Sequence, residues 1–232
     1  MGTLLLIRHG QASYGEVDYD RLSARGHEQA RAIWRFLARS RLDATYAGPL
    51  RRQQQTIATA REEAAGIPEP VTVDELAEYP AFDMLQHFIP RLVEEDSKYA
   101  ALSTGPTPKL LDDAFHAILG RWARDEWSIE GVERVDGFVA RVRTGLDKVI
   151  RAAASGARIA VVTSAGPIGV AVGLTLGVAA AERMVRTSST IRNGSISELK
   201  FRGAGFAWQP EQISLLTFNV TSHLPDELHT HR

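Results

Sequence analysis

The sequence predicts an α/β fold: a mainly parallel central sheet flanked by helices in a three-layer α/β/α arrangement. Two continuous apolar runs, residues 3–7 and 158–163, are typical of central strands, because both faces of such strands are covered. A turn and then helical periodicity follow each run. This alternation of strands and helices favours a parallel sheet.

The other elements come from apolar periodicity and from the residues that begin or end helices. Ser23 has the place of a helix N-cap, and Gly66 and Pro68 end a helix. Residues 80–156 contain no predicted strand, so we expect one domain, residues 1–232, with a mostly helical insertion at 80–156. The predicted order is a strand at 3–7, a helix after Ser23, a strand at 42–47, a helix at 50–65, a strand at 71–73, helices at 83–96, 112–127 and 133–154, a strand at 158–163, a helix from residue 167, and two antiparallel strands within 190–201 and 212–218.

Composition excludes several classes of function. The formal net charge of -1 argues against a protein that binds nucleic acid or anionic membranes through bulk charge. The absence of cysteine excludes disulfides, a thiolate nucleophile and cysteine-ligated metals. No signal peptide or membrane span is predicted, so we expect a cytoplasmic protein.

The strongest chemical signal is Arg8-His9-Gly10, directly after the first buried strand. A neutral imidazole held at a strand end can attack phosphorus, and a neighbouring arginine can stabilise the charge on the phosphoryl oxygens. Gly10 lets the backbone approach a ligand closely. An isolated Arg-His-Gly tripeptide is more often a surface feature, so this assignment depends on the rest of the chain.

Two further turns follow predicted strands, at residues 48–52 and at Ser164-Ala165-Gly166. The second turn opens a helix, whose first backbone N–H groups favour an anion. Ligands of open α/β sheets bind outside the carboxyl ends of the strands. We therefore expect these turns and Arg8-His9-Gly10 to converge on one pocket.

Three motifs occur in order: LIRHGQAS at 6–13, LSxxGxxQA at 22–30, and GPLxRxxQT at 48–56. Together they closely resemble the histidine phosphatase superfamily, the relatives of cofactor-dependent phosphoglycerate mutase. The resemblance runs from residue 3 to about residue 224, and the helical insertion is its least specific part. It implies a phosphoglycerate mutase-like α/β fold.

The resemblance also implies roles for single residues. His9 matches the nucleophile that accepts the phosphoryl group, and Arg8 and Arg52 match the two arginines that bind its oxygens. Glu78, in Leu76-x-Glu78, matches the acidic proton donor, with Asp74, Glu75 and Asp83 as the alternatives for this role. Ala165 and Gly166 match part of the phosphate pocket, and Arg51 is expected either to face solvent or to contact the substrate at the rim.

Three positions depart from the family pattern. The family's serine at the start of the third motif is Gly48 here, and the family's Ser-His-Gly turn is Ser164-Ala165-Gly166. The family's asparagine after the nucleophile loop is Gly15, which alters the substrate side of that loop. Replacement of the second histidine by Ala165 removes one cationic donor, and loss of such a donor typically lowers a rate by about 10²–10³. A water, His223 or a substrate group is a candidate for the vacated space. Otherwise His223 and Asn193 are expected to be structural.

Three functions are compatible with these residues. The first is an enzyme, a phosphatase (phosphoric monoester hydrolase) that works through a phosphohistidine at His9, slowly because of Ala165. The alternative is a non-catalytic phospho-ligand-binding protein, and a phosphoglycerate-type mutase ranks third. The expected partner is a small phosphorylated substrate or a phosphoprotein, with no nucleic acid, no membrane, no metal and no other cofactor. The loop at 11–22 and the part of the insertion from about residue 80 to 130 would select the substrate.

Overall fold

Strand β1 (Gly2–Arg8) lies inside a sheet of six strands within the residues that the computed structural model describes, 1–13, 16, 18–203 and 205–230. The strand order is β3-β2-β4-β1-β5-β6. β1 can occupy this place because its residues 2–7 are all buried, as the apolar run predicts. The other strands are β2 (Ala44–Ala47), β3 (Pro70–Thr72), β4 (Arg158–Thr163), β5 (Ile196–Phe201) and β6 (Ile213–Val220).

The sheet is mixed, with a parallel half and an antiparallel half. β1 pairs in parallel with β4, β4 with β2, and β2 with β3. β5 and β6 pair antiparallel on the other side of β1, as predicted for the two last strands. The carboxyl ends of β1, β2 and β4 therefore meet at one edge of the sheet, and the α/β fold class is confirmed.

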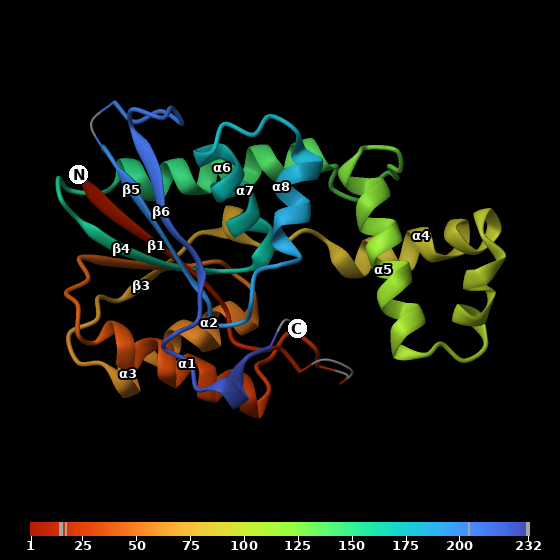
Figure 1. Cartoon of the computed structure of the whole chain (residues 1–232), viewed down its shortest axis with the longest axis horizontal. Helices are drawn as coiled ribbons and strands as arrows, with labels where there is room; N and C mark the ends of the chain where they lie inside the picture. Colours follow the sequence, from red (N-terminus) through yellow and green to blue (C-terminus); the bar gives the residue numbers. More distant parts are fainter. Residues whose placement is uncertain (14–15, 17, 204, 231–232) are drawn as a thin grey trace. The chain divides into compact units, whose positions relative to one another are not determined.

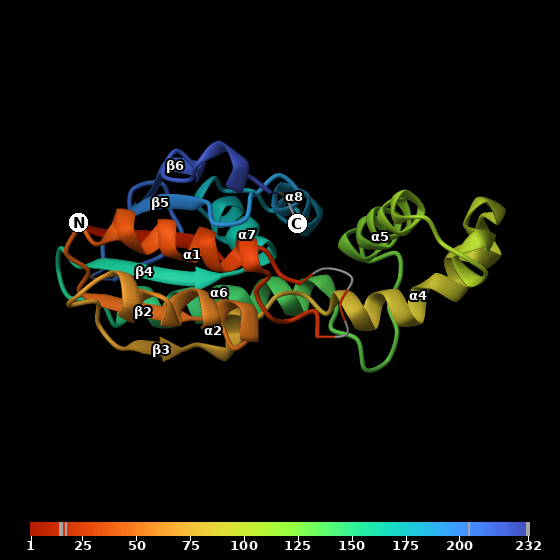
Figure 2. The same ribbon diagram turned by 90° about the horizontal axis from the view of Figure 1, so that it is seen from below.

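Helices cover both faces of the sheet (Figures 1 and 2). One face packs against α1 (Ala24–Leu37), α2 (Arg51–Ala58) and the short α3 (Ala60–Glu63). The other face is covered by α7 (Ala165–Thr175), α8 (Ala181–Ser188) and the part of α6 (Val135–Arg151) that begins at Ala140. The core under α1 to α3 consists of Leu5, Ile7, Ile33, Trp34, Leu37, Leu42, Ala47, Ile57, Ala60, Ala160, Val162 and Ile196.

The chain divides into two compact units. The first unit, Met1–Glu78 with Ala140–Arg232, contains the sheet. The second unit, Tyr79–Val139, contains α4 (Ala81–Glu95), a 3₁₀ segment (Ser97–Ser103), α5 (Pro108–Ala123) and the first turn of α6. The prediction of one domain with an insertion at 80–156 stays a prediction, since α6 belongs to both units.

The second unit is helical, as the sequence predicts, and an aromatic cluster holds it together. The rings of Tyr79 and Trp122 lie 5.6 Å apart, and those of Trp122 and Phe138 lie 5.9 Å apart. A further pair, Phe88 and Trp127, has a centroid distance of 5.4 Å. Aromatic pairs at such distances add to the stabilisation from burial.

Three helix predictions differ from the structure, and one helix was not predicted. The helix predicted at 112–127 runs from Pro108 to Ala123. The helix predicted at 50–65 is divided at Thr59, whose hydroxyl donates to the Gln55 carbonyl and competes with the helical pattern. The helix predicted from residue 167 begins at Ala165, because Pro167 lies in the first turn, where no N–H is needed. The eight-residue α8 was not predicted.

Within the described ranges, no helix combines the length and the apolar character needed to cross a membrane.

Candidate active site

The loop after β1 carries His9 and is fixed from three sides. The backbone N–H of His9 donates to the Thr163 carbonyl at 2.9 Å, and this hydrogen bond joins the ends of β1 and β4. A Cβ on Gly10 would lie 2.3 Å from the carbonyl oxygen of Gly26. The close approach that we expected toward a ligand is therefore an approach to the first turn of α1, and no side chain fits there.

The His9 ring is buried and its tautomer follows from its contacts. Nδ1 lies 2.7 Å from the Gly10 carbonyl oxygen, which can only accept, so Nδ1 carries the proton. The lone pair is then on Nε2, and it accepts a hydrogen bond from the Arg52 Nε–H at 3.0 Å. His9 is thus held as a neutral ring with Nε2 facing an arginine.

The surroundings of His9 keep it neutral. Burial is the main cause that lowers its pKa well below the ordinary value of 6.5, and the positive charges of Arg52 and Arg8 lower it further. The hydrogen bond to the Gly10 carbonyl opposes this shift but is the smallest contribution. A histidine in this state keeps a nucleophilic nitrogen at neutral pH.

Arg52 is presented by the first turn of α2, which is joined to the His9 loop. The Gly10 N–H donates to the Thr56 hydroxyl at 3.1 Å, and that hydroxyl donates to the Arg52 carbonyl at 2.8 Å. Arg52 and Thr56 share a helix face, as their spacing predicts. The Arg52 guanidinium also forms an ion pair with Asp20, and the exposed Arg51 pairs with Asp18.

Arg8 is the last residue of β1 and directly precedes His9. Its guanidinium Nη1 donates to the Ile191 carbonyl, and its backbone N–H donates to the Ser195 carbonyl at 3.0 Å. Its charge lowers the pKa of His9, so Arg8 and Arg52 both act electrostatically on the ring.

Glu78 reaches the turn that contains Ala165. The Gly166 N–H donates to Glu78 Oε2 at 3.1 Å, in the first turn of α7. The carboxyl oxygen is thus an acceptor for one of the N–H groups that have no partner within the helix. The Thr163 hydroxyl donates to the Leu76 carbonyl at 2.7 Å, which anchors the segment that carries Glu78.

Gln53 explains why glycine stands at position 48. Its side-chain oxygen accepts from the Leu50 N–H at 3.0 Å, and its side-chain nitrogen donates to the Ser164 hydroxyl at 2.8 Å. A Cβ on Gly48 would lie 2.3 Å from the Gln53 oxygen and 2.6 Å from the Leu76 carbonyl oxygen. This arrangement has no room for the serine of the family pattern. Gly15, the departure predicted in the loop after His9, lies outside the described residues.

His223 and Asn193 support the backbone of the site. His223 Nε2 donates to the Gly194 carbonyl at 2.9 Å, and its ring stacks on Phe36. The Asn193 amide donates to the His9 carbonyl at 3.4 Å and accepts from the Thr230 hydroxyl at 3.0 Å. At the Ser164-Ala165-Gly166 turn, the side chains of Glu78 and Gln53 form hydrogen bonds, whereas His223 bonds to Gly194.

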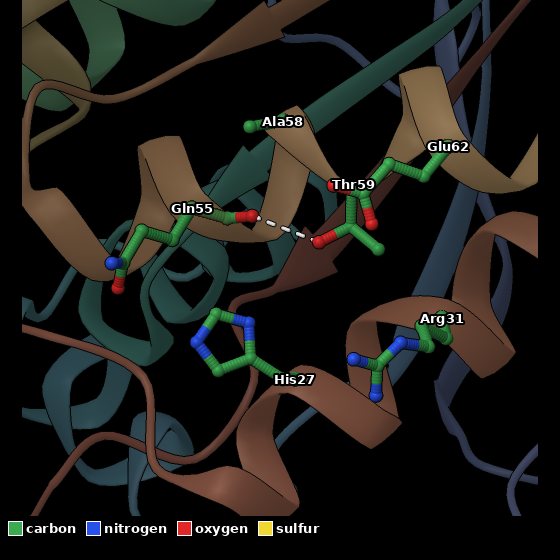
Figure 3. Close-up of a pocket in the computed structure, with 6 residues that line it drawn as sticks. All are labelled: His27, Arg31, Gln55, Ala58, Thr59 and Glu62. Carbon is green, nitrogen blue, oxygen red and sulfur yellow. Dashed lines mark hydrogen bonds between the residues drawn. The ribbon is translucent and has the colours of Figure 1, made fainter.

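A pocket of about 240 Å³ lies between α1 and the α2–α3 segment, away from the residues described above. Figure 3 shows its lining residues and the hydrogen bond between Thr59 and Gln55. None of Arg8, His9, Arg52 and Glu78 lines it. The lining residues are His27, Arg31, Gln55, Ala58, Thr59 and Glu62.

The family model of the histidine phosphatase superfamily (branch 1) matches residues 4–99 and 99–212. The chain belongs to the histidine phosphatase superfamily. Comparison with the sequences of curated proteins gives no significant match. The family expectation from the three motifs is confirmed.

Three solved structures share the fold of this chain. Mycobacterial glucosyl-3-phosphoglycerate phosphatase in complex with inorganic phosphate is 19% identical, with a TM-score of 0.68 over 97% of this chain and 100% of that chain. Bacillus stearothermophilus YhfR is 16% identical, with a TM-score of 0.67 over 96% and 99%. Shigella flexneri alpha-ribazole phosphatase is 19% identical, with a TM-score of 0.61 over 94% and 96%.

The structure also places Asp20 in an ion pair with Arg52, one of the predicted phosphate-binding residues. Sequence reasoning missed it, because no family motif in the sequence includes it. A signal was present: two acids, Asp18 and Asp20, precede the first helix, and two arginines, Arg51 and Arg52, open another.

Proposed function

We propose that this chain is a phosphatase that hydrolyses a phosphomonoester through a phosphohistidine intermediate on His9. The observation that carries the proposal is the state of the His9 ring. Its Nδ1 proton is bonded to the Gly10 carbonyl, its lowered pKa keeps it neutral, and its Nε2 faces Arg52. A neutral imidazole with a directed lone pair is the form that attacks phosphorus.

In the first step, Nε2 attacks phosphorus while the ester P–O bond breaks, and the electron pair of that bond leaves with the alkoxide. Glu78 donates its proton to this alkoxide. Arg8 and Arg52 stabilise the charge on the phosphoryl oxygens. In the free protein the Arg52 Nε–H donates a hydrogen bond to His9, and in the reaction the same N–H donates to a phosphoryl oxygen instead.

In the second step, the Glu78 carboxylate takes a proton from water as the water oxygen attacks phosphorus. The N–P bond breaks, its electron pair returns to Nε2, and inorganic phosphate leaves. The Nδ1–H bond to the Gly10 carbonyl supports the charged ring of the intermediate. Both steps use side chains of this chain alone.

Ala165 makes the proposed reaction slow. The Gly166 N–H is bonded to Glu78, so the first turn of α7 contacts the acid instead of supplying a cationic side chain to the phosphoryl group. By the usual effect of one missing donor, the rate is lower by about 10²–10³.

The proposed substrate class is a phosphomonoester. The mycobacterial structural neighbour is named for glucosyl-3-phosphoglycerate and the Shigella flexneri neighbour for alpha-ribazole, so their reaction class is the part that we carry over. A small phosphorylated molecule and a phosphoprotein both present such a group.

Release of p-nitrophenol from p-nitrophenyl phosphate tests the proposal. Turnover should disappear in His9→Ala and persist in the matched control His116→Ala, whose side chain is exposed on α5. Turnover that persists in His9→Ala would overturn the role of His9. Binding of inorganic phosphate without turnover or phosphoenzyme would establish the non-catalytic alternative.

A further inference from the structure

Asp20 holds the guanidinium of Arg52 from the side away from His9. The Arg52 Nε–H donates a hydrogen bond to His9 Nε2 at 3.0 Å, and an Nη1 N–H of Arg52 donates a hydrogen bond to Asp20 Oδ1. In a planar guanidinium, Nη1 lies opposite the edge formed by Nε–H and Nη2. The two protein partners therefore bind opposite sides of the Arg52 fork.

The edge of Arg52 that faces His9 keeps a free donor. Nη2 of Arg52 has no acceptor within the described part of the chain. Nε–H and Nη2–H together form the geometry that binds two oxygens of one phosphoryl group. This edge is directed at the nitrogen where the proposed phosphoryl transfer takes place.

Asp20 is itself fixed in place by the fold. Its second oxygen, Oδ2, accepts from the Arg51 N–H at 2.8 Å, at the first residue of α2. The neighbouring Leu22 N–H donates to the Gln55 side chain at 2.7 Å, and Leu22 forms a β-bridge with Ala12. Asp20 is therefore tied to the same helix as Arg52 and to the loop that carries His9.

The Arg52 side chain is confined on its other faces as well. It is only 9% exposed, whereas Asp20 is 37% exposed. The Tyr19 ring centroid lies 5.6 Å from the Arg52 guanidinium carbon, a cation–π distance. With Nη1 held by Asp20, rotation of the fork away from His9 is opposed.

We propose that Asp20 is a positioning residue, which holds Arg52 so that its Nε/Nη2 edge receives the phosphoryl group at His9. This inference rests on the proposed function. The opposite possibility is that Asp20 is a competitor, whose carboxylate repels the ligand and must leave before phosphate binds. The two possibilities predict opposite signs when the charge of Asp20 is removed.

The test compares Asp20→Asn with Asp18→Asn by calorimetric binding of orthovanadate and inorganic phosphate. Asp18 is the matched control, since it lies in the same loop and pairs with the exposed Arg51. We expect Asp20→Asn to weaken orthovanadate binding about tenfold or more, and phosphate binding less, because vanadate occupies the geometry of phosphoryl transfer. Asp18→Asn should bind both anions as wild type does.

A purely structural role gives a different result. Loss of the contact to the Arg51 N–H lowers the melting temperature of Asp20→Asn, but by itself it leaves the ratio of vanadate to phosphate affinity unchanged. Asp20→Glu, which retains the carboxylate, should recover part of the vanadate affinity. Equal or tighter vanadate binding by Asp20→Asn, or an equal loss in Asp18→Asn, overturns the inference.

The binding comparison does not depend on turnover. Absence of a phosphoenzyme in wild type would refute the proposed function and leave the sign of the anion-binding comparison intact. A working phosphoenzyme with identical anion binding in Asp20→Asn and Asp18→Asn would refute only the role of Asp20.

Discussion

The Gly166 N–H donates a hydrogen bond to the Glu78 carboxylate at 3.1 Å, which ties the proposed proton donor to the first turn of α7. In the family pattern this turn carries a histidine side chain, which Ala165 lacks. The helix terminus therefore orients an acid here. A phosphoryl group at His9 would depend on Arg8 and Arg52 for its charge stabilisation.

Ala165→His should raise kcat. A histidine at this position adds a donor to the phosphoryl group, and the expected gain on p-nitrophenyl phosphate is at least tenfold, with about 10²–10³ as the full effect of one such donor. Ala165→Leu is the control, because it fills space without donating. Equal activities of the histidine and leucine variants would contradict the role assigned to this position.

Glu78→Gln should separate proton donation from orientation. The amide oxygen can still accept from the Gly166 N–H, but the side chain cannot supply a proton. We expect kcat/KM on an alkyl phosphate to fall by about 10²–10⁴. The fall in kcat/KM on p-nitrophenyl phosphate should be much smaller, because this constant reports the steps up to departure of the leaving group, and p-nitrophenolate departs as a stable anion.

Glu75→Gln is the matched control for Glu78. Glu75 is close in sequence, was an alternative candidate for the acid, and pairs with Lys148. In this variant, the ratio of kcat/KM on p-nitrophenyl phosphate to kcat/KM on the alkyl phosphate should stay at the wild-type value. The assignment of the acid to Glu78 fails if Glu75→Gln changes the ratio or if Glu78→Gln leaves it unchanged.

The pKa of His9 predicts a pH dependence of stability. Burial lowers this pKa in the folded protein below the unfolded value of about 6.5, so an unfolded chain takes up the proton first as the pH falls. The contribution of His9 is fully present above pH 6.5 and is lost as the pH falls from there toward the folded pKa. Denaturant unfolding at pH 8 and pH 5 should show a smaller loss for His9→Gln than for wild type.

Gly10→Ala should destabilise the protein, because the new Cβ would lie 2.3 Å from the Gly26 carbonyl oxygen. That oxygen belongs to the backbone and cannot rotate away, so the expected cost is at least about 1–3 kcal/mol in the free energy of unfolding. Gly120→Ala is the control, since its Cβ would meet only the flexible end of Arg124 at 3.4 Å. There the helix should gain about 0.5–1 kcal/mol.

The parallel half of the fold was predictable from residues 3–7 and 158–163, because buried central strands are continuous apolar runs. The N-cap at Ser23 was predictable as well, and its hydroxyl accepts from the Gly26 N–H at 3.1 Å. The eight residues of α8 were missed, since two turns carry too few apolar positions to show a period.

The site was predictable only where residues lie in motifs. Arg8, His9 and Arg52 were predicted from the family resemblance of the three motifs at 6–13, 22–30 and 48–56. In the structure, His9 and Arg52 are in direct contact. The contacts of Asp20 with Arg52 and of Glu78 with Gly166 join residues 32 and 88 positions apart. Pairings of this kind depend on the fold, and no local pattern encodes them.

Acid-labile phosphoenzyme is the most direct measurement of the central claim. The protein is mixed with p-nitrophenyl phosphate, quenched in alkali to preserve phosphohistidine, and digested for mass spectrometry of the peptide that contains His9. The account predicts phosphate on His9 in wild type, more of it in Glu78→Gln, where the second step lacks its base, and none in His9→Ala. Turnover with no phosphate on His9, or with phosphate on another residue, would contradict it.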